Sequence, residues 1–379
     1  MQLANSILPK ATRPTKMRVA FILPGLHKVN RGAEVAFESV AQELAKIDGM
    51  KVTLFGSGKA RESDLYEFKH VPSIARKYFE YFPRLPIFRS TYTYEEVTFI
   101  IGLLNKYNPK DYDVVVTCTY PFTNWFIQAF GGKQRPAHIY VTQNGDYEVQ
   151  ANHREYRFFS CDGLICTNPE YFERNKDQWE SVLIPNGVNP SLFSPGQSSR
   201  ARFKLPENVP LVLMVSALIP SKRVMSGIRA VSQNKDLHLL VCGNGPEHKQ
   251  VKNLGENLMP GRFHLRKIPR EQMPDIYRSA DVFLHMSLDE PSANVYIEAL
   301  ATGLPIVTHD RFVTRWTLEN TSILVNTEDE LSLVESITSS LNLCSESDIS
   351  NRRNLAEDRY CWEGIGQQYL SLFCKLLRS

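Results

Sequence analysis

Two carboxylates eight positions apart are the first candidates for a functional site in this chain. Glu290 and Glu298 flank the stretch Pro-Ser-Ala-Asn-Val-Tyr-Ile. The pattern before them, residues 280–285, predicts a short buried strand, and residues 295–302 predict a helix that stops at Gly303. We therefore expect Glu290 in the loop before the helix and Glu298 on the helix, about 7 Å along its axis.

The space between these two carboxylates suits an anion. Backbone N–H groups at a helix start, here those of Ala293, Asn294 and Val295, favour phosphate. A ligand with hydroxyls at both ends and phosphates between them would fit. A nucleotide sugar is such a ligand, with its sugar on Glu290, its diphosphate on the amides and its ribose on Glu298. The alternative is a loop acid and a helix acid that both face solvent.

Length and composition predict a globular protein with two domains. The chain has 379 residues, more than one core usually carries, with 42% hydrophobic and 22% charged residues. The net charge of +3 comes without a basic run, so we expect no nucleic-acid partner. No run of 18 apolar residues predicts a membrane span. Seven cysteines without a Cys-x-x-Cys pair favour free thiols in a reducing compartment, and hence the cytoplasm.

Two runs of alternating strands and helices predict two doubly wound α/β domains. Strands are expected in the first run at residues 17–24, 51–55, 113–118, 137–141, 163–167 and 181–184. In the second run they are expected at residues 211–216, 237–242, 280–285 and 305–308. A cluster of Pro, Gly and Asn over residues 184–195 lies between the runs and predicts domains of residues 1–190 and 191–361.

Two cations follow the first strand of the second run. Ser216 ends that strand, and the loop after it carries Lys222 and Arg223 just before a predicted helix. Cations at a helix N-terminus are disfavoured unless an anion sits there. The pair therefore indicates a phosphate site, and the alternative is a solvated Lys-Arg pair.

Loops of the first run supply further candidates. Gly32 lies in the loop after the first strand, where backbone amides reach the carboxyl edge of the sheet. Asn144 and Asp146 follow the strand at 137–141 and are candidates for contact with a sugar. The alternatives are a flexible connection at Gly32 and an ordinary Asn-Gly turn at 144–146.

Residues 73–94 differ in character from their surroundings. Basic residues there outnumber acidic ones and alternate with aromatic side chains. One interpretation is a surface, residues 74–92, that contacts an anionic membrane carrying a lipid-linked acceptor. The other is a partly buried connection whose aromatic rings pack on the sheet.

The stretch Glu290-Pro-Ser-Ala-Asn-Val-Tyr-Ile-Glu-Ala-Leu-Ala-Thr-Gly-Leu-Pro-Ile-Val resembles the Glu-x7-Glu signature of retaining glycosyltransferases of the family-4 type, the glycosyl transferases group 1. Three further segments resemble the same family. Ile184-Pro-Asn-Gly-Val-Asn is similar to its hinge, Gly243-Asn-Gly-Pro-Glu to its Gly-x-Gly-Pro-Glu loop, and Arg359-Tyr-Cys-Trp to its terminal Phe-x-Trp.

This resemblance implies the GT-B fold, in which two Rossmann-like domains face each other across a nucleotide-sugar cleft. It also implies that the helix at 362–379 packs back on the first domain. The activity implied is transfer of a sugar, with retention of configuration, from a nucleotide-diphosphate sugar bound by the second domain to an acceptor on the first. The implied catalytic residues are Lys222 and Glu290. The implied donor-binding residues are Gly32, Ser216, Arg223, Gly243, Ile268, Ala293, Asn294, Val295 and Glu298, with Asn144 and Asp146 on the acceptor side. No metal and no cofactor are expected, and no cluster of His, Cys and Asp ligands stands out in the sequence.

Two positions depart from the family pattern. Arg31 stands where the first glycine of a Gly-Gly-Ala-Glu loop would be, and Ala217 stands where an arginine is usual. These departures keep open the alternatives of a catalytically degenerate nucleotide-sugar-binding protein and of another enzyme of this architecture, an epimerase or a phosphorylase. By analogy, the expected acceptor is a saccharide or lipid-linked oligosaccharide in cell-surface polysaccharide synthesis. The expected location is the cytoplasm or the inner face of the membrane.

Overall fold

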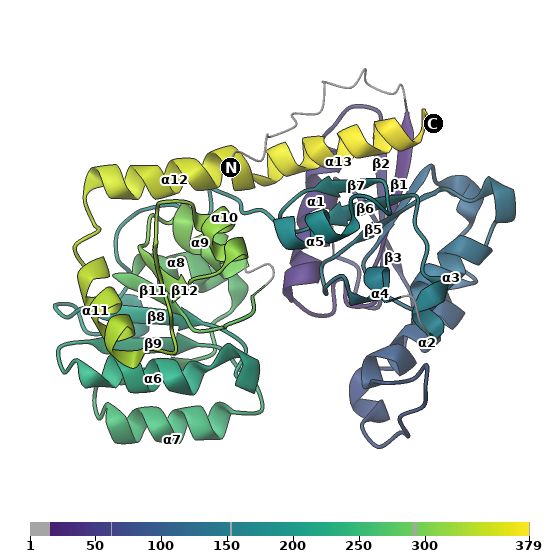
Figure 1. Cartoon of the computed structure of the whole chain (residues 1–379). Coiled ribbons are helices and arrows are strands. Elements are labelled where there is room, and N and C mark those ends of the chain that lie inside the picture. Colours follow the sequence, from purple (N-terminus) through teal and green to yellow (C-terminus); the bar gives the residue numbers. More distant parts are fainter. Residues whose placement is uncertain (1–15, 62, 152–153, 291–293, 379) are drawn as a thin grey trace. The chain divides into compact units, whose positions relative to one another are not determined.

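The chain divides into two compact units, each built on one parallel β-sheet (Figure 1). The computed structural model describes residues 16–61, 63–151, 154–290 and 294–378. The N-terminal unit comprises Met1–Asn186 and Trp362–Ser379, and the C-terminal unit comprises Gly187–Cys361. The division after Asn186 falls inside the segment 184–195, slightly before the position expected from the sequence.

The N-terminal unit has a seven-stranded sheet with the strand order β3-β2-β1-β4-β5-β6-β7. Its strands are β1 Met17–Ile22, β2 Met50–Gly56, β3 Glu67–His70, β4 Val114–Thr117, β5 Ala137–Val141, β6 Gly163–Cys166 and β7 Ser181–Leu183. Its α-helices are α1 Gly32–Ala45, α2 Thr91–Leu103, α3 Phe122–Ala129, α4 Tyr147–Gln150, α5 Pro169–Asn175 and α13 Trp362–Leu376.

The C-terminal unit has a six-stranded sheet with the strand order β10-β9-β8-β11-β12-β13. Its strands are β8 Leu211–Val215, β9 His238–Cys242, β10 Phe263–Arg266, β11 Val282–His285, β12 Ile306–His309 and β13 Ile323–Val325. Its α-helices are α6 Val224–Gln233, α7 His248–Leu258, α8 Met273–Arg278, α9 Asn294–Ala301, α10 Phe312–Leu318, α11 Glu330–Ser340 and α12 Glu346–Tyr360.

The central strands form from apolar runs because helices cover both faces of each sheet. Successive side chains of a strand point to opposite faces. In β1, Val19 and Phe21 therefore belong to one core cluster, and Ala20 and Ile22 to another. The same alternation divides β8, where Leu211 and Leu213 pack on one side of the sheet and Val212 and Met214 on the other.

Several elements are not among those expected from the sequence. The strands β3, β10 and β13 and the helices α2, α11 and α12 all belong to this group. Each of the three strands lies at the edge of its sheet, and their residues are only partly buried or exposed. Edge strands do not need apolar side chains on both faces, so their sequences lack the apolar run that marks a central strand.

The last helix, α13, belongs to the N-terminal unit although it ends the chain. Its buried side chains, including Trp362, Ile365, Tyr369 and Phe373, join the same core cluster as those of β1 and α1. Their spacing of three and four residues places them along one side of the helix. The N-terminal unit is therefore completed by the last part of the chain.

Candidate active site

The order of strands in the C-terminal unit creates one position where ligands commonly bind. Strand β8 lies between β9 and β11, so the chain runs outward from β8 to one edge and then returns to β11 on its other side. At such a switch point the loops after the two central strands diverge and leave a crevice at the carboxyl edge of the sheet. Lys222 and Arg223 follow β8, and Glu290 follows β11. The predicted catalytic and phosphate-binding residues thus come from the two loops that flank this crevice.

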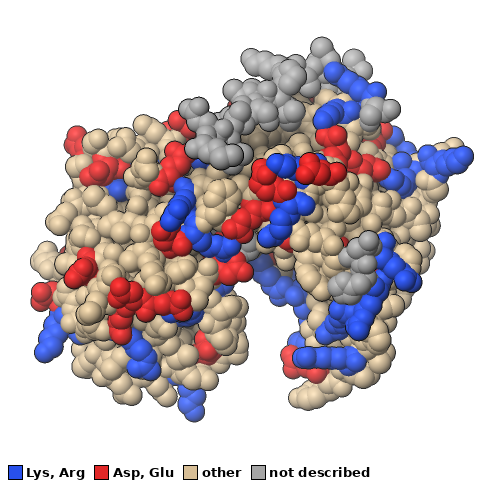
Figure 2. Space-filling model, viewed as in Figure 1, with Lys and Arg blue, Asp and Glu red and all other residues tan. Residues whose placement is uncertain are grey.

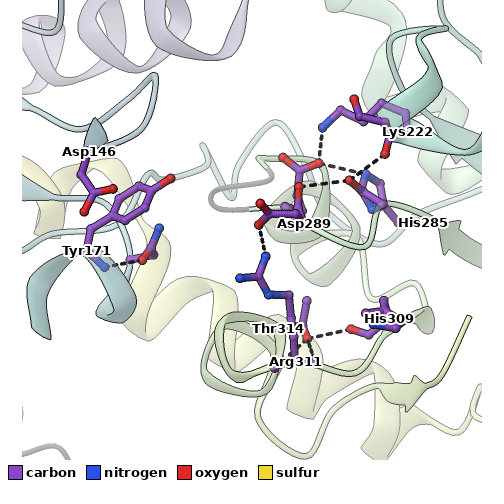
Figure 3. A network of polar contacts seen from close by, with 12 residues as sticks. Asp146, Tyr171, Lys222, His285, Asp289, His309, Arg311 and Thr314 are labelled. Carbon is purple, nitrogen blue, oxygen red and sulfur yellow. Dashed lines mark hydrogen bonds and ion pairs between the residues drawn. The ribbon is translucent and has the colours of Figure 1, made fainter. Parts of the chain in front are cut away.

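Lys222 and Glu290 are in direct contact. The Lys222 amine donates a hydrogen bond to Glu290 Oε2 (Figure 3). His285 Nε2, at the end of β11, lies 3.5 Å from the same carboxylate oxygen. The hydroxyl oxygen of Ser287 links the two loops, since it lies 3.3 Å from the carbonyl oxygen of Ser221 and 3.2 Å from that of Asp289. A cation and a carboxylate 68 positions apart in sequence are therefore held together at the switch point.

The imidazole of His285 is held in a fixed orientation and is uncharged near neutral pH. Burial lowers the pKa of His285 to about 3, and the positive charge of Lys222 adds to this effect. The hydroxyl of Tyr296 lies 3.0 Å from His285 Nδ1 and 2.8 Å from Thr308 Oγ1. His285 can therefore orient the Glu290 carboxylate through a neutral ring nitrogen without competing with Lys222 as a cation.

Arg223 stands between a short 3-10 helix and α6, with its backbone in the left-handed region (φ +50°). Its guanidinium Nη1 lies 3.2 Å from Thr327 Oγ1 and 3.4 Å from the carbonyl oxygen of Met286. The second predicted cation is thus positioned by the segments that follow β11 and β13. Left-handed backbone is uncommon for a residue with a side chain, and such positions often occur at functional sites.

Glu298 is buried in the middle of α9 and already has partners. Arg270 Nη1 lies 3.0 Å from Glu298 Oε1, and the Tyr277 hydroxyl donates a hydrogen bond of 2.9 Å to Oε2. Burial raises the pKa of Glu298, and these two partners oppose that rise. A carboxylate has about four acceptor sites, so ribose hydroxyls could bind beside Arg270 and Tyr277 or in place of Arg270. Sequence analysis missed both partners.

The two glycines of the Gly-x-Gly-Pro-Glu loop have a packing role that is independent of any ligand. A Cβ at Gly243 would lie 1.9 Å from the carbonyl oxygen of Ser216, and one at Gly245 would lie 2.4 Å from that of Leu218. Glycine is required because the loops after β8 and β9 cross at van der Waals distance. Ser216 and Gly243 are thereby brought together at the carboxyl edge. Ile268 is half-buried and packs against an apolar core cluster of this unit.

The amides predicted to hold phosphate are described only in part. Ala293 lies outside the described residues. Asn294 and Val295 are the first two residues of α9, at the helix end that favours negative charge. Strand β11 precedes this helix, so its N-terminus belongs to the same edge of the sheet as Glu290.

The N-terminal unit contains a pocket of about 410 Å³ at its own switch point, between β1 and β4. The loops after β1, β4 and β5 and the starts of α1 and α2 contribute to it. Gly32 and Asn144 both line the pocket, and the Asn144 amide donates a hydrogen bond of 3.1 Å to the carbonyl oxygen of Cys118. Gly32, expected on the donor side, is therefore grouped with the acceptor candidate Asn144.

Three carboxyl groups that the sequence did not single out line the same pocket: Glu34, Glu148 and Glu155, the last of which is paired with Arg89. Glu34 and Glu148 are both largely buried, and burial raises the pKa of each. Within the described residues, Glu148 Oε2 has no hydrogen-bond partner. An unsatisfied buried acceptor is costly, so a ligand hydroxyl would find a strong partner there. Glu148 lies only two residues beyond the candidate Asp146, but the sequence pattern does not distinguish the two.

Asp146 has several partners within the N-terminal unit. Arg174 approaches both of its carboxylate oxygens, at 2.8 and 3.1 Å, and the side-chain amides of Gln150 and Asn175 each donate a hydrogen bond of 2.9 Å. Asp146 is also absent from the lining of the pocket. Its oxygens already accept hydrogen bonds from donors on α4 and α5, so this carboxylate links the two helices, and its contact with a sugar stays a prediction.

Two further properties concern the whole described part of the chain. No helix in it is both long and apolar enough to cross a lipid bilayer. Nor does that part contain a group of three or more His, Cys, Asp or Glu side chains that could hold a metal ion.

Comparison with known proteins shows which family the C-terminal unit resembles. Residues 197–357, nearly all of the C-terminal unit, match the family model for glycosyl transferases group 1. The family model therefore matches this unit, which is less than half of the chain. The matched range contains Lys222, Glu290 and Glu298, and it excludes the pocket of the N-terminal unit.

A curated relative and two solved structures define the similarity further. The chain is 26% identical over 171 residues to the lipopolysaccharide core biosynthesis glycosyltransferase LpsE of Rhizobium meliloti, covering 44% of this chain and 48% of that protein. It therefore spans about half the length of the curated relatives it matches. Sucrose-phosphate synthase from Thermosynechococcus elongatus superposes with a TM-score of 0.79 at 21% identity, covering 96% of this chain and 100% of that one. Anabaena HepE in complex with UDP-glucose superposes with a TM-score of 0.68 at 16% identity, covering 94% of this chain and 99% of that one. The predicted GT-B fold, with two Rossmann-like domains, is confirmed.

Proposed function

We propose that this protein is a glycosyltransferase that moves a sugar from a nucleotide-diphosphate sugar to a saccharide or lipid-linked saccharide. The observation that carries the proposal is the contact between Lys222 and Glu290 at the switch point of the family-matched unit. A relative named as a lipopolysaccharide core glycosyltransferase supports an acceptor in surface-polysaccharide synthesis.

In this proposal the C-terminal unit binds the donor. Lys222, Arg223 and the first amides of α9 stabilise the negative charge that develops on the departing diphosphate. Lys acts as a compact point charge, and Arg offers a planar fork that matches phosphate oxygens. Glu290, oriented by His285, accepts hydrogen bonds from hydroxyls of the transferred sugar.

The ribose is assigned to Glu298, together with Arg270. Glu298 can accept hydroxyl hydrogen bonds in addition to the one it receives from Tyr277. Ser216 and Gly243 contribute backbone at the edge of the donor site, and Ile268 contributes an apolar contact for the base. These roles follow the family resemblance and remain proposals.

The acceptor is assigned to the pocket of the N-terminal unit. Its buried acids Glu34 and Glu148 accept sugar hydroxyls, and aromatic side chains that line it, such as Tyr120 and Tyr156, offer faces on which a sugar ring can pack. We further propose that the reaction retains the anomeric configuration and needs no metal ion, and that the protein acts in the cytoplasm.

The test is a transfer assay with the purified full-length chain. The donors are UDP-, GDP-, ADP- and dTDP-linked sugars with excess EDTA, and the acceptors are a panel of saccharides. We expect release of nucleoside diphosphate with one donor, faster when an acceptor is present, and NMR of the product should show the anomeric configuration of the donor. Donor binding without any turnover would instead establish the degenerate binding protein, and conversion of donor without acceptor would establish an epimerase.

A further inference from the structure

Exposed apolar side chains gather on the segment of residues 74–87 in the N-terminal unit. This segment lies just before α2, which Figure 1 labels. Of the sixteen large apolar side chains that are exposed among the described residues, six fall between residues 74 and 87. They are Ile74, Tyr78, Tyr81, Phe82, Leu85 and Ile87. Tyr81 is 96% exposed. A concentration of this kind marks an interaction surface, whereas single exposed apolar residues do not.

The segment is folded rather than a loose connection. Phe79 is buried and stacks on Tyr94 of α2, with 5.3 Å between ring centroids, and Phe88 lies 4.6 Å from the same ring. The Tyr94 hydroxyl donates a hydrogen bond of 2.6 Å to the carbonyl oxygen of Pro83. The inward-facing aromatic rings therefore fix the segment on α2, and the outward-facing ones are held in place with their surfaces open to solvent.

Positive charge surrounds this apolar surface. Arg76, Lys77 and Arg84 lie in the segment and Arg89 follows it by two positions, against one acid, Glu80. Figure 2 shows Lys and Arg side chains beside uncharged surface at this end of the unit. Arg76 and Arg89 pair with Glu95 and Glu155 respectively.

The remaining two cations are available to a partner. Lys77 and Arg84 are exposed, and within the described part of the chain neither has an acidic side chain within 4.0 Å. An apolar surface with unpaired cations at its border fits a surface that offers both hydrocarbon and negative charge.

The same segment forms part of the acceptor pocket. The pocket that contains Glu34 and Glu148 is also lined by Arg76 and Ile87 of the segment, and by Arg89 and Ser90 just after it. A saccharide in this pocket would therefore lie against the base of the exposed segment. This continuity connects the surface with the substrate.

We propose that residues 74–87 dock on an anionic lipid bilayer, so that the pocket receives the saccharide head group of an acceptor carried by that bilayer. Apolar and aromatic side chains enter the interfacial region, while Lys77 and Arg84 face anionic head groups. The docking half of the proposal is independent of the reaction, and the substrate half rests on the proposed function.

The test is co-sedimentation of the full-length chain with vesicles of pure phosphatidylcholine or with 30% phosphatidylglycerol. We expect binding to the anionic vesicles that weakens as NaCl is raised. The double variant Lys77→Glu/Arg84→Glu should lower the partition coefficient by at least about fivefold for each cation reversed. Tyr81→Ser/Leu85→Ser should also lower it. None of these four residues lines the pocket.

Matched controls are Lys249→Glu/Lys252→Glu on α7 and Leu331→Ser on α11, which are exposed in the C-terminal unit. These should bind vesicles as the unaltered protein does. Absence of binding to anionic vesicles, or equal loss in the controls, would overturn docking. Concentration-dependent dimerisation abolished by Tyr81→Ser/Leu85→Ser, without vesicle binding, would assign the surface to a second copy of the chain and overturn it also.

Donor binding separates this proposal from the proposed function. Nucleotide-sugar binding, measured without vesicles, should be the same in all these variants. Vesicle binding without donor binding would overturn the proposed function and leave docking intact. Donor binding without vesicle binding would overturn docking and leave the proposed function intact.

Discussion

At the scale of single residues, the contact between Lys222 and Glu290 decides how the site can work. Each removes the other's cost of burial, since a half-buried amine and a nearly buried carboxylate would both be unfavourable alone. A donor sugar entering the crevice finds a carboxylate to accept its hydroxyls and a cation for its phosphate, already arranged. The neutral His285 ring lies 3.5 Å from the same carboxylate oxygen and adds no competing charge.

This arrangement predicts coupled effects of mutation. Lys222→Ala should lower kcat by about 10²–10³, because one preorganised cation at the departing phosphate is lost. Combining it with Glu290→Gln should cost less than the sum of the two single changes, because the residues are in contact. Steady-state kinetics of the three variants measures this. Lys249→Ala, on the exposed side of α7, is the control and should leave kcat unchanged. Strict additivity would show that the pair does not act together.

A second residue-scale prediction concerns Glu148. Glu148→Gln keeps the shape of the side chain but removes the charge that strengthens its hydrogen bonds. The acceptor KM should rise about tenfold to a hundredfold, and the donor dissociation constant should stay the same. Glu173→Gln, exposed on α5, is the control and should change neither constant. An altered donor affinity would place Glu148 outside the acceptor site.

At the scale of elements, two loops must approach closely to build the donor side. The loops after β8 and β9 touch where Gly243 meets the carbonyl oxygen of Ser216, and a side chain at position 243 would not fit there. The glycine therefore shapes the edge from which Lys222 and Arg223 project, even without direct contact with a ligand.

Gly243→Ala should destabilise the protein by about 1–3 kcal/mol or more, because the added methyl group would overlap a backbone oxygen. The matched control is Gly364→Ala in α13, where a Cβ would have no neighbour within 4 Å. That change should be neutral or stabilising by up to about 1 kcal/mol, since alanine favours helix. Denaturant unfolding of both variants gives the comparison, and equal effects would refute the packing argument.

The sequence was most informative where burial on both faces demands an apolar run. Strands such as β1 and β8 could be predicted for that reason, and the stop of α9 at Gly303 is confirmed by a left-handed backbone (φ +73°). Helix α12 was missed because it is mostly polar and buries only a few side chains, among them Leu355 and Tyr360.

For the site, the sequence selected residues that the structure brings into contact where chemistry and family pattern coincided. Lys222 and Glu290 could be selected before their contact was known. Glu148 and Arg270 could not, because what distinguishes each is a tertiary environment: an unsatisfied buried oxygen in one case and a carboxylate partner in the other. The partners of Asp146 could not be predicted for the same reason, since they come from α4 and α5.

At the scale of the whole molecule, β1 and α13, the first and last elements of the described chain, belong to one unit. Helix α13 packs on α1 and shares a core with β1, so the last residues of the chain stabilise the first strand. The C-terminal unit lies between these segments in sequence.

Phe373→Ala should therefore destabilise the N-terminal unit by about 3–5 kcal/mol, because a fully buried aromatic ring is removed. Hydrogen exchange should become faster in β1 and α1 but not in β8. Leu377→Ala, at a side chain 45% exposed, is the control and should shift stability by less than about 0.5 kcal/mol. Loss of protection in β8 as well would show that the two units unfold as one.

The most direct test of the central claim is thermal unfolding of the full-length chain against UDP-, GDP-, ADP- and dTDP-linked sugars, with Glu298→Ala alongside. A ligand that binds only the folded state stabilises it by about 2.7 kcal/mol at a hundredfold excess over Kd. We predict a concentration-dependent rise in Tm with one of these donors, much reduced in Glu298→Ala. No rise with any donor, or an equal rise in the variant, would contradict the assignment of the donor site.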